Sequence, residues 1–161
     1  SNSYHGSEVE LRNALEELYV AQGVDLVIAG HDHFYERTWP VSAETVMDTG
    51  EDNLFSRGQG PIHLVIGIAG RSAYEELDEP QPEWSAFREN NSYGWTRLVY
   101  DGNDGQLSMT HYRIDGTIGD QFTITESAVN SDSGDSNVLG LTGIDTVLTI
   151  IVLLGAVIRK R

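Results

Sequence analysis

The stretch that decides the fold is VDLVIAGHDHFYERT, which occupies residues 24–38. Its first six residues form a nearly continuous apolar run that follows a helical pattern and Gly23, so they predict a buried parallel strand. The run ends abruptly at Gly30, and His31, Asp32 and His33 come next. Because open α/β sheets bind ligands just beyond the carboxyl ends of their strands, the two histidines lie where a site is expected.

Two interpretations of this histidine pair stay open from its spacing alone. Gly30 would allow a tight backbone turn, and imidazoles two residues apart can reach a common point. Imidazole is a good ligand for zinc and iron, so the pair could hold a metal ion. Two nearby histidines also occur in polar turns that bind nothing. Asp32, between them, is expected to be solvated.

The composition excludes several classes of function. The chain has 161 residues, 39% of them hydrophobic, and a mean hydropathy of −0.30, which suits one globular domain with a core. The 10 basic and 25 acidic residues give a net charge of −15. Such a surface repels phosphate backbones, so we expect no nucleic-acid partner. The absence of cysteine excludes disulfide scaffolds, thiol catalysis and cysteine zinc sites.

The rest of the pattern predicts one helix, several strands and two long loops. The segment DGNDG at 101–105 is a strong hairpin signal between two strands. Periodicity and turn residues predict a helix over 7–21, strands over 62–68, 96–100, 106–112 and 122–125, a long loop over 44–60, and an acidic surface loop over 71–94.

The tail differs from the rest of the chain. Residues 126–137 form a polar linker, residues 138–158 carry one charge, and residues 159–161 are basic. A helix over 138–158 would span about 31 Å, which matches a hydrocarbon core of about 30 Å. We expect a single transmembrane helix with a cytoplasmic basic end, and a main domain that is extracellular or lumenal, at the cell surface, vacuole or lysosome. The alternatives are a cleaved lipid-anchor signal and a buried C-terminal helix.

Residues 24–38 resemble the last metal-binding block of the purple acid phosphatases, whose pattern is V-D-x-V-x-x-G-H-x-H-x-Y-E-R. Residues 61–70, 84–88 and 93–98 are similar to that family's C-terminal region, especially in its long animal-type members. Residues 1–6 resemble the segment after the family's upstream His-x-Pro ligand. The resemblance covers about residues 1–125. It implies an α/β fold, the C-terminal part of a calcineurin-like four-layer αββα metallophosphoesterase sandwich, followed here by the transmembrane helix.

The resemblance also implies a binuclear metal centre, with Fe(III) beside a divalent Zn, Mn or Fe. Carried over to this chain, His31 would hold the divalent ion and His33 the iron. Such a metal pair clamps a phosphate and lowers the pKa of a water molecule, so the implied activity is acid hydrolysis of phosphate monoesters.

Other residues receive roles from the same resemblance. His5 matches the family's substrate-side histidine, which contacts phosphate and acts as a general acid toward the leaving alkoxide. Tyr35, Glu36 and Arg37 are expected to orient the metal ligands by hydrogen bonds rather than to react.

Three further polar residues need a separate interpretation. His63 lies in an apolar strand and His111 near a strand end, so both are expected to be structural. Asn90 begins the sequon Asn90-Asn91-Ser92, which predicts glycosylation on a lumenal loop.

The chain departs from the family in its earlier blocks. Asp-x-Gly, Gly-Asp-x-x-Tyr, Gly-Asn-His and the histidine of His-x-Pro have no counterpart here, and in the family they supply the remaining ligands. We therefore expect the C-terminal part of an enzyme, inactive by itself, with a homodimer as a candidate assembly. The alternatives are a non-catalytic membrane-anchored ectodomain of the same fold and a related calcineurin-like phosphodiesterase.

Overall fold

A computed structural model describes residues 9–43, 45–50, 52–126 and 149–153. The described residues form one helix and strands in three sheets. A five-stranded sheet has the order β11-β1-β6-β2-β7, a four-stranded sheet has the order β5-β10-β9-β8, and β3 pairs with β4. The elements are α1 (Val9–Ala21), β1 (Val24–Ala29), β2 (Tyr35–Thr38), β3 (Val41–Ser42), β4 (Thr45–Val46), β5 (Leu54–Ser56), β6 (Ile62–Ile66), β7 (Ser85–Glu89), β8 (Gly94–Asp101), β9 (Gln106–Arg113), β10 (Ile118–Thr125) and β11 (Thr149–Leu153).

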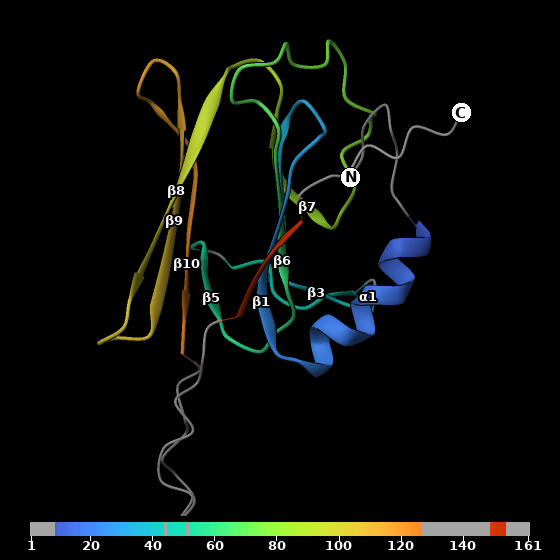
Figure 1. Cartoon of the computed structure of the whole chain (residues 1–161), viewed down its shortest axis with the longest axis vertical. Coiled ribbons are helices and arrows are strands. Elements are labelled where there is room, and N and C mark those ends of the chain that lie inside the picture. The colour runs from blue at the N-terminus through green and yellow to red at the C-terminus, as the bar shows by residue number, and fades with distance from the viewer. Residues whose placement is uncertain (1–8, 44, 51, 127–148, 154–161) are drawn as a thin grey trace, which may run out of the picture.

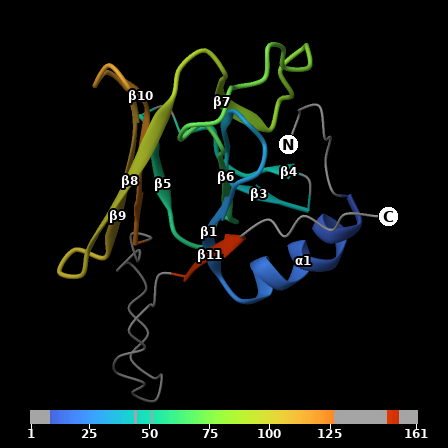
Figure 2. The same cartoon turned by 45° about the horizontal axis from the view of Figure 1, so that its top comes forward.

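These elements stack in layers, with the five-stranded sheet between α1 and the four-stranded sheet (Figure 1, Figure 2). The α/β class predicted from the sequence is confirmed. Within the described ranges the arrangement is helix, sheet, sheet, and the fourth layer of the expected αββα sandwich is not among them.

The main core lies between the two large sheets. Each large apolar side chain that is fully buried there contributes roughly 1.5–3 kcal/mol relative to exposure. The members of this core are Leu26, Phe34, Tyr35, Phe55, Ile62, Leu64, Ile68, Leu107, Met109, Phe122 and Ile124. The core therefore fixes the end of β1 and the start of β2, between which the histidine turn lies.

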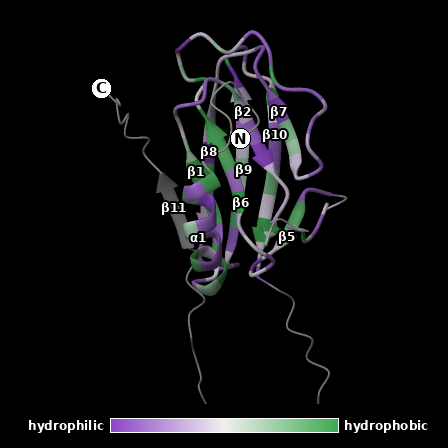
Figure 3. Ribbon diagram, turned by 90° about the vertical axis from the view of Figure 1, so that its right-hand side faces the viewer, coloured by the Kyte–Doolittle hydropathy of each residue, from purple (hydrophilic) through white to green (hydrophobic). Residues whose placement is uncertain are grey.

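The helix α1 packs on the other face of the five-stranded sheet through a narrow apolar stripe. Tyr19 contacts Val24 and Val27 there, whereas Leu11 and Leu18 stay half exposed. Figure 3 faces this helix and shows hydrophilic residues along it. Gly23, at φ 61°, ends the helix as the sequence predicts, because a left-handed residue after the last turn is easiest for glycine.

The predicted parallel strand is confirmed as β1, which pairs in parallel with β6 and β11. The hairpin over 101–105 is confirmed between β8 and β9. The two loop predictions are wrong in part, because residues 44–60 contain β4 and β5, and residues 71–94 contain β7. The sequence of β7 shows no apolar alternation, since its buried ends Ser85 and Glu89 are polar residues that bond to other strands.

The predicted transmembrane helix is wrong over Thr149–Leu153, which form strand β11 beside β1. This run is rich in β-branched residues, which favour strands. Strands in parallel sheets are also continuously apolar, so an apolar run of this kind is compatible with a strand as well as with a membrane helix. The remainder of 138–158 lies outside the described residues. Among the described elements, no helix is long and apolar enough to cross a membrane.

Candidate metal centre

The histidine pair lies in the turn that connects β1 to β2, at the carboxyl end of β1. His31 is exposed and has a backbone φ of 81°, a left-handed value that is unusual for any residue other than glycine. The left-handed residue is therefore His31 and not Gly30, which has no positive φ and open space where a Cβ would lie. Strain of this kind, of order 1–3 kcal/mol, is concentrated at functional sites.

The two neighbours of His31 in this turn are less exposed. His33 is half-buried, and Asp32 is 7% exposed, so the expectation of a solvated Asp32 is wrong. The Asp32 carbonyl accepts a hydrogen bond from the Phe34 N–H at 2.9 Å, which closes the turn.

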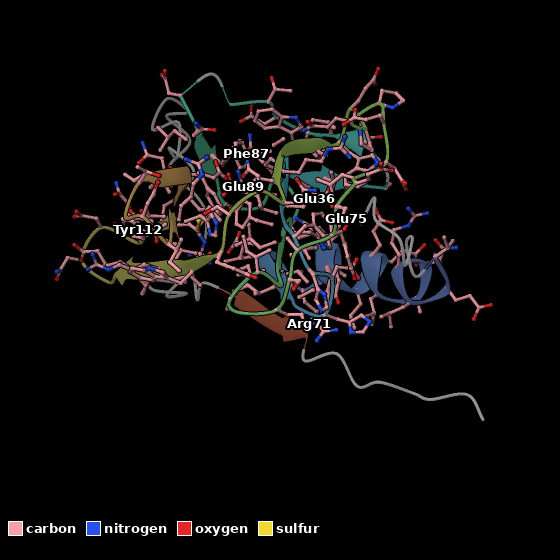
Figure 4. All side chains as sticks on the ribbon, turned by 90° about the horizontal axis from the view of Figure 1, so that it is seen from above. Glu36, Arg71, Glu75, Phe87, Glu89 and Tyr112 are labelled. Carbon is pink, nitrogen blue, oxygen red and sulfur yellow. The ribbon has the colours of Figure 1, made fainter. Side chains whose placement is uncertain are left out.

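A second loop, after β6, presses against this turn. A Cβ added to Gly67 would lie 1.7 Å from the Asp32 carbonyl oxygen, so the two backbones meet where only glycine fits. The Gly67 N–H also donates to the Phe34 carbonyl at 3.1 Å. Figure 4 views the molecule from this end and labels Arg71 and Glu75 of the same loop. The histidine turn is thus held by a segment more than 30 residues later in the chain.

Tyr74, in that loop, stacks its ring on the imidazole of His33, with centroids 5.2 Å apart. Sequence reasoning missed this residue. Its only signal is an aromatic side chain in an acidic, otherwise polar segment.

The donor set fits a metal in part. His31 and His33 are two imidazoles on one turn, and imidazole suits zinc and iron. Among the residues that the structure describes, no group of three or more His, Asp or Glu side chains is placed to hold a metal ion. These two residues can therefore supply part of a metal site, and His5 lies outside the described residues.

The predicted roles of Tyr35 and Arg37 in orienting the histidines are wrong, because both side chains point to the opposite sheet. Tyr35 Oη donates to Asp120 Oδ2 at 2.8 Å, and Arg37 Nε donates to the same oxygen at 2.7 Å. Burial first, and then the charge of Asp120, raise the pKa of Tyr35 well above its usual value, so it remains a donor. In the described ranges neither residue hydrogen-bonds to His31 or His33.

Glu36 lies on the other side of β2, as strand alternation requires. Its Oε1 accepts a hydrogen bond from Ser85 Oγ at 2.9 Å, which ties β2 to β7. Figure 4 labels Glu36, together with Phe87 and Glu89 of β7 and Tyr112 of the opposite sheet. Residues 35–37 therefore bond β2 to β7 and to the opposite sheet, and these sheets carry the turn.

The other two described histidines are a buried residue, His111, and a half-buried one, His63. His111 is fully buried, stacks on Tyr35 with centroids 4.0 Å apart, and places Nε2 at 3.3 Å from Glu89 Oε1. Burial lowers the pKa of His111, and Glu89 opposes that shift. Burial also lowers the pKa of His63 to about 4, at a position where its ring faces Tyr19 of α1. Both environments agree with a structural role.

Asn90, the sequon residue, follows the last residue of β7. Its Nδ2 donates to the Tyr74 carbonyl oxygen at 2.7 Å, and the side chain is half-buried. Nδ2 is the atom that N-glycosylation modifies. A glycan at Asn90 would have to replace this contact.

Comparison with known proteins agrees with this geometry. The profile of a family described as "Iron/zinc purple acid phosphatase-like protein C" matches residues 60–121. The chain is 36% identical over 124 residues to zebrafish (Danio rerio) "Acid phosphatase type 7", an alignment that covers 74% of this chain and 27% of that protein. It is 31% identical over 129 residues to "Probable inactive purple acid phosphatase 27" of Arabidopsis thaliana, covering 77% of this chain and 21% of that protein.

A solved structure leads to the same family. The purple acid phosphatase isolated from yellow lupin (Lupinus luteus) seeds superposes with a TM-score of 0.62 at 28% identity, over 71% of this chain and 20% of that one. The chain thus spans about a quarter of the length of the curated relatives that it matches. The sequence and the fold together place the chain in the purple acid phosphatase family, as a carrier of that family's C-terminal domain.

Proposed function

We propose that this chain contributes His31 and His33 to the metal centre of an acid phosphatase that hydrolyses phosphate monoesters. The observation that carries the proposal is the strained left-handed backbone of His31, in a turn that the Gly67 loop clamps beside a half-buried His33. A backbone held in an unfavourable conformation at two potential ligands is the pattern expected of a preorganised site. In the family pattern His31 belongs to a divalent Zn, Mn or Fe and His33 to Fe(III).

When bound, two such metal ions supply positive charge that polarises a phosphoryl oxygen and lowers the pKa of a water molecule. The chain's own contribution is to hold two neutral imidazoles at fixed positions at the end of β1. Cations bound at the site would also make the local potential there favourable to an anionic ester, although the chain as a whole carries a net charge of −15. The role of His5 as a general acid stays a prediction.

The test compares metal content and p-nitrophenyl phosphate hydrolysis in the complete protein that carries this chain. His31→Ala and His33→Ala should each remove one metal and nearly all turnover, whereas His5→Ala should lower the rate by about 10²–10⁴-fold. His63→Gln is the matched control, since this histidine faces α1 and should leave the metal content unchanged. A His31→Ala protein that keeps both metals would refute the proposal. Residues 1–161 alone should show no hydrolysis.

The alternative function is a non-catalytic domain of the same fold. One observation favours it: a relative bears the name "Probable inactive purple acid phosphatase 27". Wild-type protein that binds no zinc, iron or manganese would support this alternative.

The location of the domain also stays a prediction. We propose an extracellular or lumenal position, which rests on the apolar composition of 138–158 and the basic residues after it. Protease digestion of intact cells or sealed microsomes tests it, since a domain on the cytoplasmic side would be cut in sealed microsomes.

A further inference from the structure

The loop after β6 contacts His33 at both its ring and its backbone. Tyr74 stacks on the imidazole with an interplanar angle of 28°, and its N–H donates to the His33 carbonyl at 3.1 Å. Burial raises the pKa of the Tyr74 phenol, a hydrogen bond from the His33 backbone opposes this, and the charge of Asp32 adds to it. Tyr74 is itself half-buried beside the half-buried His33.

Tyr74 is held in turn from the other side. Asn90 Nδ2 donates to the Tyr74 carbonyl oxygen at 2.7 Å, so both backbone polar groups of Tyr74 are hydrogen-bonded, its N–H to His33 and its carbonyl to Asn90. The position of Asn90 is itself fixed, because the neighbouring Glu89 is buried and its Oε2 accepts a hydrogen bond from Arg113 Nε of β9 at 2.8 Å. The same oxygen forms an ion pair with Arg113 Nη2 at 2.7 Å.

We propose that Tyr74 and Asn90 are positioning residues for the metal ligand His33. The ring of Tyr74 restricts rotation of the His33 imidazole. The Asn90 amide holds the Tyr74 backbone in the position from which its ring can stack on that imidazole. Groups that orient a histidine ligand change metal affinity typically by 10–100-fold when they are removed. The proposal rests on the proposed function, because it assigns the support of that same site.

The proposal also gives Asn90 a role that does not need a sugar. Asn90 begins the only sequon, and its Nδ2 is already used as a donor. The positioning role requires Nδ2 to donate to the Tyr74 carbonyl, whereas glycosylation attaches a sugar to the same atom. Substitutions that affect only one of these two roles can therefore separate them.

The experiment is a Zn²⁺ titration of the complete protein, followed through the NMR signals of the His31 and His33 imidazoles. Asn90→Asp removes the amide donor and the sequon together. Ser92→Ala is the matched control, because it removes the sequon and leaves the Asn90 amide intact; the Ser92 hydroxyl donates to the Tyr93 carbonyl of the neighbouring residue. Tyr74→Leu removes the ring, and Tyr74→Phe retains it.

In Asn90→Asp and Tyr74→Leu we expect Zn²⁺ affinity to fall by about 10–100-fold, and the upfield ring-current shift of the His33 protons to be reduced. Ser92→Ala and Tyr74→Phe should keep wild-type affinity and shifts. Unchanged His33 shifts in folded Asn90→Asp and Tyr74→Leu proteins would overturn the positioning role. A wild type that binds no Zn²⁺ but shows the ring-current shift would instead count against the proposed metal function and leave the stacking geometry standing.

Discussion

Arg37 on β2 and Asp120 on β10 form an ion pair through two hydrogen bonds that joins the two large sheets. The Arg37 Nε donates to Oδ2 at 2.7 Å and Nη2 to Oδ1 at 3.0 Å, and both side chains are at least 95% buried. The guanidinium also lies over the rings of Trp39 and Phe122, each at 5.5 Å. This pair therefore anchors β2, the strand that follows the histidine turn.

Breaking this pair should be costly. Asp120→Ala leaves the Arg37 charge buried without its partner, and we expect the free energy of unfolding to fall by about 3–5 kcal/mol. The control is Glu79→Ala, because the Glu79 side chain is 75% exposed, so water can replace it beside Arg88. The Arg88 side chain is itself 4% exposed but keeps its hydrogen bond to the Asp78 carbonyl at 2.6 Å, and we expect a loss of less than about 1 kcal/mol. Urea denaturation of both variants measures the difference. Equal losses would show that Arg37 and Asp120 do not hold the sheets together.

Gly67 should not tolerate a side chain. Gly67→Ala places a Cβ against the Asp32 carbonyl, so the loop or the histidine turn must move, and we expect a loss of about 1–3 kcal/mol. Gly30→Ala is the control, since its Cβ meets nothing within 4 Å and its φ is not positive. Thermal unfolding compares the two. A Gly30→Ala protein as unstable as Gly67→Ala would contradict the account of the clamp.

The strain at His31 predicts a difference between two substitutions. Both His31→Gly and His31→Ala remove the imidazole, but glycine adopts a φ of 81° with little cost whereas alanine does not. We expect the glycine variant to be the more stable of the two by about 1 kcal/mol. Equilibrium denaturation of the pair checks this, and equal stabilities would mean that the backbone of this turn is unstrained.

The half-buried His63 predicts a loss of stability in acid. Its pKa is about 4 in the folded protein, against an ordinary value near 6.5 in the unfolded chain, chiefly because burial disfavours the charged ring. The unfolded state therefore takes up the proton first as the pH falls. The stability that the neutral ring provides is complete above about pH 6.5 and is lost progressively down to about pH 4, by at most about 3 kcal/mol. His63→Gln should flatten this part of the stability profile, and an unchanged slope between those pH values would refute the assignment.

Strand β11 predicts that the apolar tail stabilises the sheet. On an edge strand, one of every two consecutive N–H groups points to the neighbouring strand. The double variant Ile150→Pro, Ile151→Pro therefore removes a backbone hydrogen bond to β1, and we expect the free energy of unfolding to fall by about 3 kcal/mol. Urea denaturation of the purified chain measures this. Unchanged stability, together with retention in the membrane pellet after alkaline carbonate extraction, would show that the tail is a membrane helix.

Local pattern was sufficient for the elements whose side chains alternate or repeat regularly. The helix end at Gly23, the parallel strand β1 and the hairpin between β8 and β9 are all encoded within a few neighbouring residues. The histidine pair was also visible, since a strand, a glycine and two imidazoles are contiguous in the chain. These features depend on backbone propensity and short-range turn chemistry, which a sequence carries directly.

The partners of those residues were decided only by the tertiary structure. Tyr35 and Arg37 are adjacent to the histidines in sequence, yet strand alternation turns them to Asp120, 85 and 83 residues away. His33 is supported by Tyr74, and Tyr74 by Asn90, from two later segments. The same apolar tail that fits a bilayer as a helix forms β11 where β1 offers an edge. In each case the deciding energy is a contact between distant segments, and neither propensity nor periodicity along the chain contains it.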